Sequence, residues 1–161
     1  PVPAGQPVCF AVRRGEVENR LDAFYWQPKF RALDAALELH MPYVKQLAAI
    51  ATGLTNGDHG GITYTDKGVR YLRGQAVTEF GLQLKNDELY ISEEDHLRMI
   101  RAEVLPGDVL YTIAGSTGNA CVVSGIERAN INQAIVRVRP DNSIYPQFLA
   151  DFLRACLRSP N

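Results

Sequence analysis

The sequence predicts an α+β fold, with strands through the middle of the chain and helices near its two ends. Residues 62–140 hold most of the strand-like stretches, whereas amphipathic helical patterns lie at residues 28–40 and 148–157, with one short helical piece between them. Strands and helices are thus segregated along the chain, which argues against a doubly wound α/β sheet. We expect twisted, mixed or antiparallel strands with amphipathic helices near the N- and C-terminal ends.

The bulk composition is that of an ordinary globular protein. Of 161 residues, 46% are hydrophobic and 22% are charged, so the chain can bury a core without disulfides or metals. It has no apolar run long enough to span a bilayer and no signal-peptide pattern, so we expect a cytoplasmic protein without a membrane partner. Cys9, Cys121 and Cys156 are scattered, which predicts reduced, buried thiols. The formal net charge is −1, so a nucleic-acid partner requires locally concentrated positive charge.

The first third of the chain alternates between helical patterns and loops. VCFAV, residues 8–12, predicts a short strand. Pro28 suits the first turn of a helix, and the apolar residues that follow share one face, which predicts a helix over residues 28–40. One or two further helical turns are expected to end at Gly53. TGLTNGDHGG, residues 52–61, is the most loop-like stretch of the sequence.

The middle of the chain predicts short strands and one short helix. ITYT, VRYLRG and QAVTEF have the composition of strands. Ser92 and the three acidic residues after it fit a capping box that opens a helix. We expect Leu97 and Ile100 on the inner side of this helix and His96 on its solvated side.

A hairpin and a final helix are predicted in the last third. GDVLYTIAGSTGNACVV, residues 107–123, consists of two apolar runs around a small polar tip, and Asp108 is expected to close a turn by hydrogen bonding to backbone. IVRVRP, residues 135–140, alternates as a strand with Arg137 and Arg139 on one face. The last helix is expected to carry a wide apolar stripe, which consists of Phe148, Leu149, Phe152, Leu153, Cys156 and Leu157.

Several kinds of chemistry are poorly supported by the sequence. No glycine–lysine pair followed by Ser or Thr forms a phosphate-binding loop, and Ser116 does not fit the G-x-S-x-G nucleophile elbow, because Gly115 directly precedes it. Among the histidines, only His59 in the glycine-rich stretch is a functional candidate. A small metal-dependent nuclease that uses Asp58, His59 and Asp108 is an alternative, although no acid-x-Lys pattern follows Asp108.

The polar residues of the predicted loops form a recognition set instead. They are mainly Thr, Asn, Gln, Ser, Tyr and Arg. Arginine pairs with guanine, Asn or Gln with adenine, and Ser or Thr with phosphates or base edges. Solvated loops of the same composition occur in many proteins, so a protein-interaction module without DNA binding is the second alternative.

Taken in order, six segments resemble the target recognition domain of type I restriction–modification specificity subunits, a domain also found in some fused methyltransferase–endonucleases. RLDAFYWQPKF, residues 20–30, is similar to the family's opening R-L-D-P-x-Y-Y-x-P. VRYLRGQAV resembles its Y-I-R-G-x-D-I strand, and residues 104–123 resemble its G-D-I-L-x-x-x-x-G-x-x-G-x-x-x-x-V. The other three similar segments are LAAIATGLT, ANINQAIVRVRP and YPQFLADFLR.

The resemblance implies a non-catalytic domain that reads one half of a bipartite double-stranded DNA target. It implies a lead-in at residues 1–19 and a single recognition domain at 20–161, which ends where a conserved spacer helix would begin. Its partners would be DNA, adenine methyltransferase (modification) subunits and the restriction or motor subunits. S-adenosylmethionine and ATP would bind those subunits, so no cofactor and no metal are expected here.

The resemblance also directs attention to polar residues on the predicted loops and strands. Asn132 and Gln133 are expected to be structural, because they open a buried strand. For Ser116 and Thr117, contact with DNA and a plain turn are both open. The candidate DNA-binding residues are Thr52, Thr55, Asn56, His59, Tyr64, Arg70, Arg73, Gln75, Ser116, Thr117 and Asn119.

Overall fold

The computed structural model describes residues 26–40, 46–58, 60–84 and 88–158, in two compact units that comprise residues 1–45 and 46–161. The described part of the first unit holds one helix, α1 (Pro28–Glu38), which begins at Pro28 as the sequence predicts. None of the α1 residues is buried, and Leu33 and Leu37 are exposed. The strand expected at residues 8–12 lies outside the described residues.

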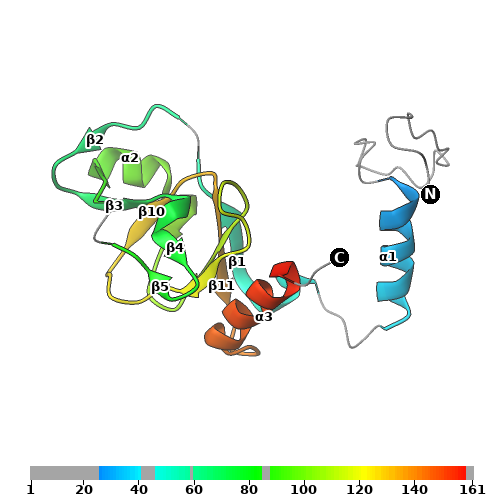
Figure 1. Ribbon diagram of the computed structural model, residues 1–161. Coiled ribbons are helices and arrows are strands. Elements are labelled where there is room, and N and C mark those ends of the chain that lie inside the picture. Colours follow the sequence, from blue (N-terminus) through cyan, green and yellow to red (C-terminus); the bar gives the residue numbers. More distant parts are fainter. Residues whose placement is uncertain (1–25, 41–45, 59, 85–87, 159–161) are drawn as a thin grey trace. The chain divides into compact units, whose positions relative to one another are not determined.

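The second unit contains two main sheets (Figure 1). The first has four antiparallel strands in the order β1-β11-β8-β9. These strands are β1 (Ala51–Asn56), β11 (Ile135–Pro140), β8 (Val109–Thr112) and β9 (Ala120–Val122). The predicted hairpin is confirmed as β8 and β9, and the predicted strand at residues 135–140 is confirmed as β11. On β11, Arg137 lies opposite Thr55 of β1 and Leu110 of β8.

The second sheet is mixed. Its order is β2-β6-β3-β10-β7, and β3 and β10 run parallel while the other pairs are antiparallel. Its strands are β2 (Tyr64–Thr65), β6 (Tyr90–Ile91), β3 (Val69–Leu72), β10 (Ala129–Ile131) and β7 (Glu103–Val104). A separate small hairpin joins β4 (Val77–Thr78) to β5 (Gly81–Leu82). The predicted α+β class with mixed strands is therefore confirmed.

Helices cover the outer faces of this arrangement. α3 (Pro146–Arg158) packs on β8 and β9 through Leu149 and Ala150, and the main core lies between the two sheets. α2 (Glu93–Arg98) adjoins the second sheet, where Met99 packs with Tyr71 and Ile91. Three 3₁₀ helices complete the fold, namely η2 (Leu47–Ile50), η3 (Gly74–Ala76) and η4 (Ile100–Ala102).

The cap of α2 was predicted correctly, but the buried face of the helix was not. The Ser92 hydroxyl accepts a hydrogen bond from the Asp95 backbone N–H at 3.1 Å. Leu97 and Ile100 are exposed, whereas His96 is 1% exposed. The helix buries His96 because Asn130 and Glu103 provide polar partners for both ring nitrogens.

The loop expected at residues 52–61 is wrong over its first half. Residues through Asn56 form strand β1, so no helix ends at Gly53; the helical turn preceding β1 is η2. The sequence ATGLTN has little strand character of its own. It is extended because it pairs along the length of β11, which lies about eighty residues later in the chain.

The apolar stripe of the final helix is divided between the core and the surface. Leu149 is buried, but Phe148 and Phe152 are 60% and 54% exposed and stack on each other with ring centroids 6.3 Å apart. Cys121 is buried as expected, whereas Cys156 is exposed, so the expectation of buried thiols is wrong for Cys156. Cys9 lies outside the described residues.

Candidate nucleic-acid interface

Four chain segments far apart in the sequence meet at one edge of the second unit, which we call the loop edge. They are residues 56–58 after β1, 73–75 at η3, 113–117 in the β8–β9 turn, and 132–134 between β10 and β11. Asp58 forms a parallel bridge with Asn132, and the Asn132 N–H donates to the carbonyl of Leu72 at 3.0 Å. The Ile113 N–H donates to the Ala134 carbonyl at 2.9 Å. Backbone hydrogen bonds thus hold the segments together.

A glycine permits the closest of these approaches. A Cβ on Gly57 would lie 2.0 Å from the Ile131 carbonyl oxygen and 2.4 Å from the Asn132 carbonyl carbon. Those atoms belong to backbone and cannot move aside cheaply. Gly57 therefore allows the segment after β1 to lie directly against the start of the β10–β11 link.

Five of the sequence-predicted residues lie on the loop edge. Asn56, Gln75, Ser116 and Thr117 are exposed there, and Arg73 is half-buried at the start of η3. They come from three segments, so the fold brings together residues as distant in the sequence as Asn56 and Thr117. Amide, hydroxyl and guanidinium groups on one surface suit contacts to base edges and phosphates.

The tip of the β8–β9 hairpin is held by a buried residue that sequence reasoning missed. The Thr112 hydroxyl donates to the Ser116 carbonyl at 2.6 Å and accepts from the Asn119 N–H at 3.0 Å. Gly115 and Gly118 have φ values of +73° and +89°, which L side chains rarely adopt. The turn therefore uses backbone and Thr112, which leaves the Ser116 and Thr117 side chains exposed.

Three predicted residues are engaged within the protein. The Thr55 hydroxyl is buried and accepts from Arg101 Nη1 at 2.5 Å. Asn119 Nδ2 donates to the Val77 carbonyl at 3.3 Å, which ties the start of β9 to β4. Thr52, which lies nearer the other end of β1, donates to the Arg139 carbonyl at 3.3 Å.

Arg70 and Tyr64 lie on neighbouring strands of the second sheet. Arg70 Nη2 donates to the Tyr90 hydroxyl at 3.1 Å, and its guanidinium lies 5.2 Å from the centre of the Tyr90 ring. Its Nη1 is buried and has no hydrogen-bond partner among the described residues. Tyr64 is 55% exposed and packs edge-on against Tyr71. His59 lies outside the described residues.

Two arginines that were not predicted as site residues concentrate positive charge beside Thr55. Arg137 is 6% exposed, and its Nη2 donates to the Arg101 carbonyl at 3.2 Å. Burial, together with the nearby charges of Arg139 and Arg101, lowers the pKa of Arg137. Neither Arg101 nor Arg137 forms an ion pair with a carboxylate within the described part of the chain. The alternation at residues 135–140 signals Arg137, but no local pattern signals Arg101, which the fold brings to β1.

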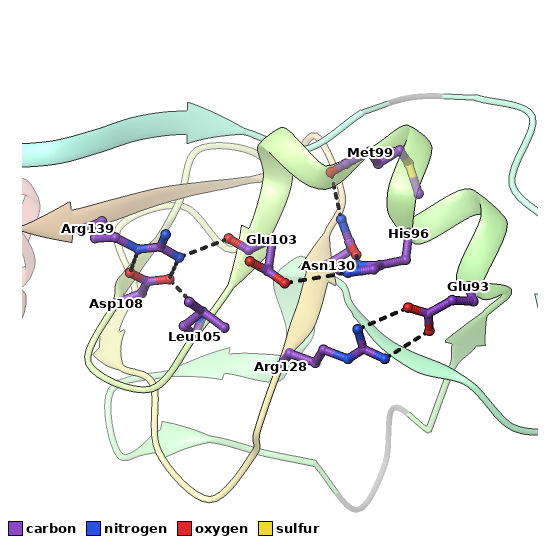
Figure 2. A network of polar contacts seen from close by, with 9 residues as sticks. All are labelled: Glu93, His96, Met99, Glu103, Leu105, Asp108, Arg128, Asn130 and Arg139. Atoms are coloured by element: carbon purple, nitrogen blue, oxygen red, sulfur yellow. Dashed lines mark hydrogen bonds and ion pairs between the residues drawn. The ribbon is translucent and has the colours of Figure 1, made fainter.

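A separate polar network includes side chains of α2, β10 and β11 (Figure 2). A His96 ring nitrogen bonds to the Asn130 side-chain oxygen, and Asn130 Nδ2 donates to the Met99 carbonyl at 2.9 Å. Asp108 accepts from Arg139 Nε and Nη2 at 2.7 and 2.9 Å, and from the Leu105 N–H at 2.8 Å. The predicted turn-closing role of Asp108 is thereby confirmed.

The arrangement does not favour the nuclease alternative. Asp108 is committed to Arg139, and the hollow it lines shares no residue with the hollow lined by Asp58. Across residues 26–40, 46–58, 60–84 and 88–158, no three His, Cys, Asp or Glu side chains are grouped to hold a metal ion. No described helix is both long enough and apolar enough to cross a membrane.

Comparison with solved structures shows a similar fold in a restriction–modification assembly. A chain from a structure described as the structural basis of complex assembly and conformational transition of the type I R-M system matches with a TM-score of 0.54 and 15% identity, over 80% of this chain and 33% of that one. The HsdS subunit from Thermoanaerobacter tengcongensis matches with a TM-score of 0.49 and 18% identity, over 78% and 36%. No protein-family model and no curated protein matches the sequence.

This chain spans about a third of the length of these two structures. At 15% identity, the first likeness concerns the fold alone. The fold that the sequence resemblance implies is therefore confirmed: the chain has the fold of part of a type I restriction–modification component.

Proposed function

We propose that this chain reads one half-site of a bipartite double-stranded DNA target, as the specificity component of a restriction–modification methyltransferase and endonuclease. The meeting of exposed Asn, Gln, Ser and Thr side chains at the loop edge carries this proposal. These groups pair with base edges and phosphates. Rigid strands hold the segments that bear them, so their positions are largely formed before DNA arrives.

The similar fold within a type I R-M system supports the same role. In such an assembly, adenine methyltransferase subunits would modify a flipped-out adenine with S-adenosylmethionine, and motor subunits would cleave DNA with ATP. This chain would contribute recognition and no catalysis. Its half-site would be one of two, since the target of the assembly is bipartite.

The charge distribution is consistent with DNA discrimination inside a larger complex. The chain has a net charge of −1, so it lacks the general phosphate attraction that gives isolated DNA-binding proteins most of their affinity. Arg101 and Arg137 supply local positive charge beside β1. We expect the isolated chain to bind weakly and the methyltransferase subunits to provide most phosphate contacts.

Selection from a randomised duplex library at low salt tests the proposal. The tagged chain is the bait, and the retained DNA is sequenced. Enrichment of a motif of about three to five base pairs supports half-site recognition. Retention without a motif, removed uniformly by salt, reduces the proposal to non-specific binding and contradicts half-site reading.

Two arginine variants separate base reading from phosphate contact. Arg73→Ala should relax one base position and cost about 1–3 kcal/mol in binding to the selected site. Arg101→Ala should weaken binding evenly across sequences and reduce the salt dependence by about one phosphate contact. If both variants behave alike, the assignment of Arg73 to base reading is wrong.

A protein-interaction module remains the second candidate, because the stacked Phe148 and Phe152 leave an apolar surface on α3 exposed to solvent. This candidate predicts no retention of duplex DNA at any salt concentration. The library experiment therefore separates the two candidates directly.

A further inference from the structure

A hollow of about 340 Å³ lies beside the loop edge. Its walls come from the segment after β1, from strands β2 and β3, and from the link between β10 and β11. The residues that line it are Asp58, Gly60, Gly61, Ile62, Tyr64, Tyr71 and Gln133. The parallel bridge between Asp58 and Asn132 holds two of these walls together, and it places Gln133 next to the bridge.

Tyr71 contributes a phenol side chain to the wall of the hollow. The residue is 2% exposed and comes from β3, in the interior of the second sheet. Its ring packs at 63° against Tyr64, with centroids 6.1 Å apart. Its side chain lines the hollow.

The charge state of Tyr71 defines what the hollow offers. Burial, the Tyr64 phenol and the Asp58 carboxylate together raise the pKa of Tyr71 to about 12. The phenol is therefore neutral at pH 7 and is able to donate a hydrogen bond. Asp58 is acceptor-only when ionised, and the Gln133 amide both donates and accepts. The hollow thus combines one strong acceptor, one phenol donor and one amide.

We propose that this hollow binds the edge of an amino-bearing nucleobase, adenine or cytosine, at one position of the target. Asp58 accepts a hydrogen bond from the exocyclic amino group, and Gln133 and Tyr71 complete the contacts on either side of it. Guanine and thymine present a carbonyl oxygen at the corresponding place, which the carboxylate repels. The exposed ring of Tyr64 forms an apolar wall for the base. This inference rests on the proposed DNA-reading function and adds a base class to it.

The test repeats the library selection with the wild-type chain and three variants. Asp58→Asn keeps the size of the side chain but adds a donor, so it should admit guanine or thymine. Tyr71→Phe keeps the ring and its packing and removes only the hydroxyl. Glu94→Gln is the matched control, because it also removes one negative charge but lies exposed on α2, outside the residues that line the hollow.

We expect the wild-type motif to contain a position restricted to adenine or cytosine. Asp58→Asn should reduce the preference at that position by about 5-fold to 150-fold, as for the loss of a good base contact. Tyr71→Phe should weaken the same position less, and Glu94→Gln should leave it unchanged. Which of the two bases is enriched at that position shows whether the hollow binds adenine or cytosine.

The outcomes separate this inference from the function on which it rests. Should the wild-type chain enrich no motif, the proposed function fails, and this inference fails with it. Should it enrich a motif while Asp58→Asn and Tyr71→Phe give the preferences of Glu94→Gln, DNA reading stands and the role of the hollow is overturned. A motif without any position restricted to adenine or cytosine overturns it as well.

Discussion

The loop edge and the polar network of Figure 2 use the same residue types in opposite ways. In the network, Asn130 is fully buried, and its amide bonds to a His96 ring nitrogen and to the Met99 carbonyl. At the loop edge, Asn56 is exposed at the end of β1. The residue type therefore does not decide its role. The surroundings decide whether the side chain holds the fold together or faces a ligand.

The difference has a free-energy basis. A buried polar group that loses its partner pays its full desolvation cost, so the network residues are committed to one another. Side chains at the loop edge are hydrated before binding, and they exchange water for base or phosphate groups at little net cost. Substitutions in the network should therefore change stability, whereas substitutions at the loop edge should change recognition.

Asp108→Ala should give the largest loss of stability. The variant removes both hydrogen bonds to Arg139 and the bond from the Leu105 N–H. We expect the free energy of unfolding to fall by about 3 kcal/mol, at the lower end for a buried pair because Arg139 keeps some contact with solvent. Urea denaturation measures this, with Glu94→Gln as the exposed control. An unchanged urea midpoint would contradict the stabilising role of Asp108 and, with it, the difference between the network and the loop edge.

A matched pair of asparagine variants tests the comparison most directly. Asn130→Ala leaves His96 and the Met99 carbonyl without a side-chain partner, so we expect a loss of about 2 kcal/mol. Asn56→Ala at the loop edge should change stability by less than about 0.5 kcal/mol. Both are measured by urea denaturation, and equal losses would show that the two regions do not differ.

Acid should weaken the region around α2 through Asp95. Its pKa lies below the ordinary value of 3.8 because it accepts the Thr63 backbone N–H and, secondly, hydrogen bonds from Arg98. The stabilisation is therefore present above pH 3.8 and is lost as the pH falls through the lower folded-state value. Asp95→Asn should flatten the fall in unfolding free energy in this acidic range. Identical pH profiles for variant and wild type would contradict this role.

The smallest effect on stability is expected at the hairpin tip. The double variant Ser116→Ala, Thr117→Ala should change the free energy of unfolding by less than about 0.5 kcal/mol, because both side chains are exposed. It should weaken retention of the selected DNA if these hydroxyls contact it. Thr112→Val is the matched control, since it removes the buried hydroxyl that holds the turn, and should cost about 1–2 kcal/mol. Equal stability of the two variants would contradict the role of Thr112.

Elements with a complete local signal were predicted well. Pro28 marks the start of α1, Ser92 caps α2, and the alternation of residues 135–140 is that of β11. The hairpin with its glycine-bearing tip follows from two apolar runs around a polar turn. In each case the deciding interactions lie within a few residues of one another.

Elements that depend on distant partners were missed. β1 is a strand because β11 offers it a ladder of hydrogen bonds, and Arg101 reaches Thr55 because η4 lies beside β1. His96 is buried because Asn130 and Glu103 provide polar partners for its two ring nitrogens. Apart from Glu103, which closely follows α2, these partners are far apart in the sequence and leave no local pattern.

The sequence by itself determined the α+β class, the termini of several elements, and the set of amide, hydroxyl and guanidinium groups available for recognition. Only the tertiary structure decided which of these groups meet at the loop edge. It also decided which form hydrogen bonds inside the protein, as those around Asp108, Asn130 and Thr112 do. The reason is that local propensity and turn chemistry act over a few residues. Burial and hydrogen-bond satisfaction, by contrast, are properties of neighbours in space.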